Sequence, residues 1–306
     1  MDASYPLRAL GIGEIFDRAI TIYIRHFAPL TLIVMTLTVP IAILQGLVAP
    51  DRVGFARAIQ DMSHPGSATP FNTPEFVAIM LISMVALMLF PVVYSAVAVG
   101  VADIYNNKAP SYARSMSRAL RRFWPLMGVT LLYGGIIGGV YVGFVIVIML
   151  LAFLTAALMS VSTVLGVIGW IFVGIVALAL VAALLLLVLG LAFSTYATVI
   201  ELKGVIVALT SSFSRLYTRK EMAKALLMVL AYCGLNLGIL LLTGALSFGA
   251  DSLLHNNIVD LVIQAIVSAC SGAMLTVLLA VYYYDVRTRS EGLDLEVELA
   301  RLTSAA

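Results

Sequence analysis

Six long apolar segments, separated by short polar ones, constrain the fold of this chain more than any other feature. A helix that crosses the hydrocarbon core of a bilayer, about 30 Å thick, needs about 20 mostly apolar residues. Because the chain is 62% hydrophobic and only 11% charged, it falls outside the composition of soluble globular domains. We therefore predict an all-α, polytopic membrane protein with six transmembrane helices. The six segments lie at roughly 28–48, 76–101, 125–152, 163–199, 223–247 and 258–284.

The positive charges predict how these segments are oriented. Sixteen of the eighteen Lys and Arg residues fall in four clusters, and two apolar segments lie between successive clusters. The clusters are Arg8 to Arg25, Lys108 to Arg122, Lys203 to Lys224 and Arg287 to Arg301. All four clusters can therefore face one compartment, and by the positive-inside rule this is the cytoplasm. We expect a multi-pass protein of the inner membrane with both termini cytoplasmic, whose basic clusters face anionic lipid headgroups.

The six segments form three similar units within a single integral membrane domain, approximately residues 8–104, 105–201 and 202–289, followed by a tail at 290–306. Each unit opens with a short amphipathic segment that has an apolar stripe and a basic face, which is typical of a helix in the membrane interface. The alternative is that these segments are only the cytoplasmic turns of long spans. In the first two units a proline, Pro29 or Pro125, follows closely and predicts a corner between the short helix and the span.

An acidic residue stands at the end of each even-numbered span: Asp103, Glu201 and Asp285. Negative charge at a helix carboxyl end opposes the helix dipole, so a compensating cation is expected. We hypothesise that these carboxylates pair with arginines of the short helices, such as Arg18, Arg118 and Arg215. Glu14 is expected to form a salt bridge with Arg18, four residues along the same helix. The other members of this candidate structural or headgroup-binding cluster are Asp17, Arg121, Arg122 and Arg287.

Glycines recur at helical spacing in the third span and predict close helix packing. Small residues let helix backbones approach each other in lipid. We expect packing within one subunit, with a dimer interface or a hinge in a moving helix as alternatives. The residues are Gly134, Gly135, Gly138, Gly139 and Gly143.

The central parts of the spans contain no ionisable residue, which argues against an ion-coupled carrier. Asn236 and Gln264 are the strongest buried polar candidates there. We find no metal-ligand spacing, phosphate-binding loop or catalytic constellation, so we expect no cofactor, no nucleic-acid partner and no enzymatic activity. The leading hypothesis is a non-enzymatic membrane protein that interacts with lipids or supports a membrane-bound protein partner. The alternatives are a transporter or channel subunit and, third, a lipid-acting enzyme built on Glu14, Asp17, Glu201 and Asp285.

Two terminal motifs resemble a known bacterial family, the glycerophosphoryl diester phosphodiesterase membrane domain and its stand-alone relatives. The motifs are Leu10-Gly11-Ile12-Gly13-Glu14-Ile15-Phe16-Asp17-Arg18-Ala19, with Tyr23 and Phe27 beyond it, and Tyr283-Tyr284-Asp285-Val286-Arg287-Thr288-Arg289-Ser290-Glu291-Gly292-Leu293-Asp294-Leu295-Glu296. With Glu201 and Gly204 before the third basic segment, the resemblance covers most of the chain. It implies a six-span membrane protein. It does not imply hydrolysis, because the metal-binding catalytic barrel of the family's namesakes has no counterpart in this sequence.

Overall fold

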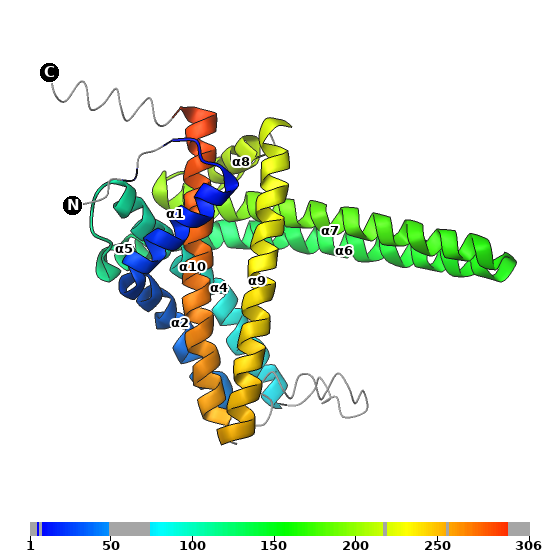
Figure 1. Cartoon of the computed structure of the whole chain (residues 1–306), viewed down its shortest axis with the longest axis horizontal. Coiled ribbons are helices and arrows are strands. Elements are labelled where there is room, and N and C mark those ends of the chain that lie inside the picture. The colour runs from blue at the N-terminus through cyan, green and yellow to red at the C-terminus, as the bar shows by residue number, and fades with distance from the viewer. Residues whose placement is uncertain (1–4, 6–7, 49–73, 217–218, 255–256, 293–306) are drawn as a thin grey trace.

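The computed structural model describes residues 5, 8–48, 74–216, 219–254 and 257–292, and each element within these residues is an α-helix (Figure 1). Most of the predicted tail at 290–306 lies outside the described residues. The described helices are α1 (Ile12–Arg25), α2 (Phe27–Val48), α4 (Pro74–Tyr105), α5 (Tyr112–Arg121), α6 (Phe123–Val161), α7 (Thr163–Ile200), α8 (Val205–Leu216), α9 (Arg219–Leu254) and α10 (Asn257–Glu291).

The order of the helices follows the predicted repeat of one short helix and two long ones. The short helices α1, α5 and α8 precede the pairs α2 and α4, α6 and α7, and α9 and α10. The two proline corners are also confirmed. His26 alone separates α1 from α2, which begins at Phe27, and Arg122 alone separates α5 from α6. Pro29 and Pro125 then lie in the first turn of the long helix, where the missing N–H leaves no hydrogen bond unmade.

Six of the described helices are long and apolar enough to cross a bilayer, and they match the six predicted segments. They are α2, α4, α6, α7, α9 and α10, and each is longer than the segment that predicted it. Helix α10 continues for six residues beyond Asp285 to Glu291. Asp285 is therefore an intrahelical residue, whereas Glu201 caps α7 as predicted.

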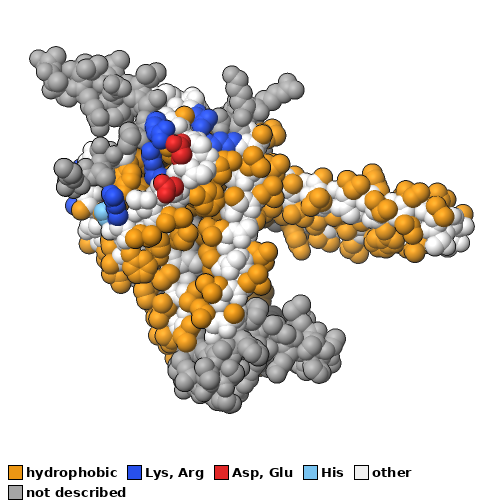
Figure 2. Space-filling view, in the orientation of Figure 1, with side chains coloured by type: hydrophobic (Ala, Val, Ile, Leu, Met, Phe, Trp, Pro, Cys, Tyr) orange, Lys and Arg blue, Asp and Glu red, His pale blue; other side chains and the backbone are white. Residues whose placement is uncertain are grey.

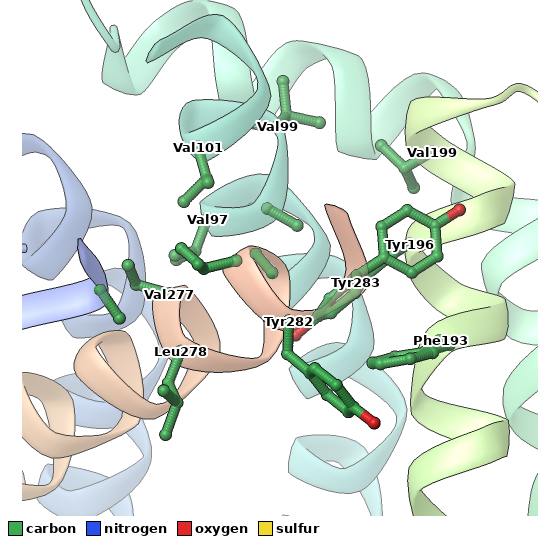
Figure 3. Close-up of a cluster of buried hydrophobic side chains, with 14 of the residues drawn as sticks. Val97, Val99, Val101, Phe193, Tyr196, Val199, Val277, Leu278, Tyr282 and Tyr283 are labelled. Carbon is green, nitrogen blue, oxygen red and sulfur yellow. The ribbon is translucent and has the colours of Figure 1, made fainter. Parts of the chain in front are cut away.

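Helix α10 forms the centre of the bundle and contacts α1, α2, α4 and α9. Its buried face meets apolar side chains from α4 and α7, as Figure 3 shows. The ring of Phe193 lies 5.4 Å from that of Tyr282 and 5.3 Å from that of Tyr283, between ring centroids. Tyr196 packs edge-on against Tyr283 at 5.8 Å. Such aromatic contacts stabilise the fold by more than the burial of their apolar area alone. They hold α7 against α10.

Helices α6 and α7 form a long hairpin that projects sideways from the bundle, across the direction of α9 and α10 (Figure 1). Ser162 alone separates the two helices, so the turn between them is tight. Most of the hairpin surface is exposed and apolar: Phe153 and Val161 are each 78% exposed. In water this surface would be unstable, but in a bilayer acyl chains cover it.

The structure does not pack the five α6 glycines against another described helix of the same chain, and a dimer interface or a hinge at these residues stays a prediction. A methyl group added at Gly134, Gly135, Gly138, Gly139 or Gly143 would meet no atom within 4 Å, so these residues face open space rather than another helix. Close packing in the hairpin instead uses Gly166 against Met159, and Gly169 against Thr155. Spacing alone identifies small residues on one face of a helix, but it does not show which face a neighbour covers.

Candidate functional site at the charged end of the bundle

Charged side chains gather at one end of the bundle, whereas hydrophobic side chains cover its length and the hairpin (Figure 2). We call this region the charged end and define it by three buried or largely buried carboxylates, Asp103, Glu201 and Asp285, with their cationic partners. Each carboxylate comes from a different long helix or from its cap. The three therefore tie the three units of the chain together at the same level.

Glu201 has the most extensive set of partners. Arg215 of α8 donates two parallel hydrogen bonds to its carboxylate, at 2.7 and 2.8 Å. Lys203 lies 2.6 Å from the same group, and the Nε atom of Arg287 lies 3.2 Å away. The hydroxyl of Tyr283 also donates to Glu201. A bidentate guanidinium–carboxylate pair fixes orientation as well as charge, so Glu201 sets the position of α8 relative to α7 and α10.

A second acidic residue extends this network. Glu291, near the end of α10, accepts from Arg215 and from the Nε atom of Arg287, the latter at 3.0 Å. Three cations, Lys203, Arg215 and Arg287, therefore face two carboxylates. This small excess of positive charge stabilises the ionised carboxylate of Glu201, which is largely withdrawn from water.

The pKa of Glu201 reflects this arrangement. Burial alone would raise the pKa of this carboxyl, but hydrogen bonds from Arg215, Lys203 and Tyr283 outweigh burial and lower the pKa from 4.5 to about 2. Burial would likewise lower the pKa of Arg215, and the Glu201 carboxylate raises it further above its ordinary value instead. Both groups are charged throughout the physiological pH range.

Asp285 holds the amino-terminal segment against α10. Its carboxylate accepts the backbone N–H of Leu10 at 2.6 Å and pairs with Lys224 of α9 and Arg289 of α10. Lys224 and Arg289 each also donate to the carbonyl oxygen of Leu10, both at 2.7 Å. Three side chains from two helices thus bind both backbone polar groups of a single residue, Leu10, whose side chain is itself buried.

Asp103 pairs with two arginines of α5. Its carboxylate lies 3.0 Å from Arg118 and 3.5 Å from Arg114. The aspartate is buried, but both arginine side chains remain about half exposed. Together with Lys108 and Ala109 they line a hollow of about 400 Å³, which we call the basic hollow. Three cations face it and one buried carboxylate lies beneath it, so the hollow has a net positive charge.

The structure brings part of the predicted cluster together. Two of the expected arginines, Arg118 and Arg215, do pair with span-end carboxylates. Glu14 pairs with Arg8 at 2.7 Å and accepts the N–H of Gly11 at the start of α1, and its predicted salt bridge with Arg18 stays a prediction. Arg18 attracts Glu14 electrostatically and hydrogen-bonds to the side chain of Tyr105.

The remaining predicted residues lie apart from the buried carboxylates. Asp17 is exposed on α1, Arg121 is exposed at the end of α5, and Arg122 is half-buried between α5 and α6. Arg287 does join the Glu201 network.

Sequence reasoning missed several partners of the three carboxylates. Lys203 and Arg289 lie two and four residues from the acidic residue that they bind, so proximity in sequence could have identified them. Lys224 and the Leu10 peptide come from distant parts of the chain. Their approach depends on tertiary packing, and no local pattern signals it.

These helices define an all-α polytopic membrane protein, with apolar helices long enough to cross a bilayer and a cluster of charges at one end of the bundle. Comparison with protein-family models, with curated proteins and with solved structures finds no match. The resemblance to the glycerophosphoryl diester phosphodiesterase membrane domain therefore stays a prediction from the two terminal motifs.

Proposed function

We propose that this chain is a non-enzymatic protein of the inner membrane that binds anionic lipid headgroups at its charged end, which faces the cytoplasm. The observation that carries this proposal is the basic hollow. Lys108, Arg114 and Arg118 converge on it, and among the described residues Asp103 is the acidic group that pairs with these arginines. Guanidinium groups are well suited to phosphate because their donors match two oxygens at once. Arg118 and Arg114 keep donors available because each contacts Asp103 through one nitrogen only.

Exposed apolar side chains on the helix of the two arginines and on the helix that follows it support a lipid ligand over a soluble anion. Along the same helix, Leu120 is 53% exposed, and Trp124 at the start of α6 is 80% exposed. Exposed tryptophan beside arginine is typical of the level at which headgroups meet acyl chains. The positive-inside rule supports a cytoplasmic orientation of this end. A phospholipid could then place its phosphate in the basic hollow and its chains along the apolar surface below.

The ionic partners of the acidic residues support a non-enzymatic role. General acid–base chemistry on a lipid would require carboxylates that face a substrate. Glu14, Glu201 and Asp285 each pair with Arg or Lys instead. The described residues also contain no group of three or more His, Cys, Asp or Glu side chains arranged to hold a metal ion.

Lipid retention by two matched double variants tests this proposal. The protein is reconstituted in vesicles of phosphatidylcholine and phosphatidylglycerol, extracted in mild detergent, and analysed for bound lipid by mass spectrometry. Lys108→Gln with Arg114→Gln removes two charges from the hollow, and Arg118 remains to pair with Asp103. Arg121→Gln with Arg122→Gln removes the same charge from the same region but outside the hollow. We expect enrichment of phosphatidylglycerol over phosphatidylcholine to fall several-fold in the first variant. Unchanged enrichment in both variants would contradict the proposal.

One observation favours a second candidate, a transporter or channel subunit. Asn236, which the sequence marks as a buried polar residue, lines a cavity in the apolar part of the bundle. Flux of ions and small solutes from protein-containing liposomes measures this activity directly. Flux above that of protein-free liposomes would favour the second candidate over the first.

A further inference from the structure

A large cavity lies among five helices, α4, α6, α7, α9 and α10. It encloses about 850 Å³, within the size range of pockets for small organic ligands. It is separate from the basic hollow, because the residues that line the two do not overlap. The cavity therefore has no part in the headgroup binding proposed above.

The position of the cavity along α10 places it deep in the apolar part of the bundle. The polar lining of this helix runs from Ser268 to Thr276, which lie 17 and 9 residues before Asp285. At about 1.5 Å per residue these positions are roughly 14 to 26 Å from the charged end. A hydrocarbon core about 30 Å thick contains that entire range.

The cavity opens on the lipid-facing surface of the bundle. Leu87 of α4 and Leu131 of α6 both line it, and each is 61% exposed. Exposed leucines at this depth face acyl chains in a membrane. A ligand can therefore enter from the bilayer without passing through water.

The lining combines apolar side chains with uncharged hydrogen-bonding groups. Tyrosines from four helices converge on it: Tyr94, Tyr133, Tyr196 and Tyr232. The carboxamide of Asn236 lies beside Tyr232.

The same lining disfavours a charged ligand. The described lining contains no Asp, Glu, Lys, Arg or His. An ionised group at this depth would lose its hydration without gaining a counter-charge, which is costly. An uncharged hydroxyl or ester can instead exchange hydrogen bonds with the phenols and the amide.

We infer that this cavity binds an uncharged amphipathic lipid of the diacylglycerol type, with its hydroxyl and ester groups among the tyrosines and Asn236. Its hydrocarbon chains lie along the leucines and Phe90 and extend through the opening into the bilayer. An ordinary anionic phospholipid does not satisfy this chemistry, because its phosphate has no partner in the cavity.

Two glycines on the same helix provide a matched pair of variants. Gly135 lines the cavity, whereas Gly138 does not, and a Cβ atom at either position meets nothing within 4 Å. Gly135→Phe therefore fills the cavity, and Gly138→Phe adds the same ring outside it. Asn236→Leu is a third variant that removes the amide. Its described hydrogen bond is to the carbonyl of Tyr232 in its own helix, so the tertiary packing is retained.

The test uses the full chain in nanodiscs of phosphatidylcholine that contain a small fraction of diacylglycerol bearing a diazirine on its acyl chain. Irradiation and peptide mass spectrometry then locate and quantify the labelled residues. We expect labelling within the cavity, about tenfold weaker in Gly135→Phe, weaker in Asn236→Leu, and unchanged in Gly138→Phe. Thermal unfolding of each variant verifies that it is folded.

Competition identifies the class of lipid. Excess unlabelled diacylglycerol should displace the probe from the cavity, and excess phosphatidylglycerol should not. Equal labelling of the Gly135→Phe and Gly138→Phe proteins would overturn the inference, as would equal competition by phosphatidylglycerol. The basic hollow is intact in these three variants, so this result is independent of the headgroup test.

Discussion

The guanidinium of Arg215 makes two parallel hydrogen bonds to Glu201 and also contacts Glu291 and the hydroxyl of Tyr283. Its side chain is only 6% exposed. A cation withdrawn from water to this extent depends on the number and direction of its hydrogen bonds, and not on charge alone. The planar geometry of arginine is therefore required at this position.

Replacement of Arg215 by lysine tests this requirement. Lysine keeps the charge but cannot make two parallel bonds to one carboxylate, so Arg215→Lys should reduce the free energy of unfolding by about 1–3 kcal/mol. Arg121→Lys is the control, because Arg121 is exposed, and its effect should stay within about 0.5 kcal/mol. Unfolding in detergent measures both changes. Equal effects of the two substitutions would show that the geometry of Arg215 is unimportant.

The lowered pKa of Glu201 predicts a loss of stability in acid. Because its pKa falls from 4.5 in the unfolded chain to about 2 in the folded protein, the unfolded chain binds this proton at higher pH. The stabilisation is fully present above about pH 4.5 and is lost as the pH falls toward 2. In unfolding measurements across this range, the stability difference between wild type and Glu201→Gln should shrink as the pH falls. A constant difference would contradict this account.

At the scale of the helix, α6 and α7 show which small residues determine packing. A Cβ atom added at Gly166 would come within 2.9 Å of the Cβ and 3.0 Å of the Cα of Met159, and these atoms cannot move away without moving the backbone. A Cβ atom at Gly139 meets nothing within 4 Å. The two glycines lie in the same hairpin but have opposite surroundings.

Alanine substitution should therefore have opposite effects at these two positions. Gly166→Ala should destabilise the hairpin by about 1–3 kcal/mol through overpacking. Gly139→Ala should be neutral or slightly stabilising, since alanine favours the helix over glycine. Resistance to proteolysis near Ser162 in detergent, together with thermal unfolding, reports on both. Destabilisation by Gly139→Ala alone would indicate that its face packs against another molecule.

The sequence predicts the elements well and their contacts only in part. Apolar length identifies the six long helices, and Pro29 and Pro125 locate two helix boundaries, because both signals depend on local chemistry. The pairs Asp103–Arg118 and Glu201–Arg215 could be predicted because 15 and 14 residues separate their members. The Leu10 contacts, the cavity and the open surroundings of the α6 glycines depend on the packing of distant helices, and local sequence does not encode it.

At the scale of the whole molecule, the hairpin constrains how the protein lies in the bilayer. Helix α7 has 38 residues, or about 57 Å at 1.5 Å per residue, nearly twice the thickness of the hydrocarbon core. Residues 123–200 contain no Asp, Glu, Lys, Arg or His that would favour emergence into water. We therefore expect the hairpin to lie at a steep tilt in the bilayer, which agrees with its direction across α9 and α10 (Figure 1).

This tilt predicts that Ser162, at the tip of the hairpin, remains within the membrane. In a background with Cys233 and Cys270 replaced by Ser, a membrane-impermeant maleimide should not label Ser162→Cys in intact vesicles of either orientation. It should label the protein after detergent is added. Asn106→Cys, exposed at the charged end, should react only from the cytoplasmic side. Labelling of Ser162→Cys from the opposite side would contradict the tilt, and labelling of Asn106→Cys from that side would contradict the proposed topology.

The hydrogen bonds at Leu10 have a consequence for the order in which the chain is completed. The peptide of Leu10 is bound by Lys224, Asp285 and Arg289, which follow it by 214 to 279 residues. During synthesis the amino-terminal segment therefore emerges long before its binding partners exist. It can dock only when α10 has been made and inserted, so its docking is a late step of assembly. A chain truncated before α10 lacks Asp285 and Arg289, so the amino-terminal segment cannot dock in it.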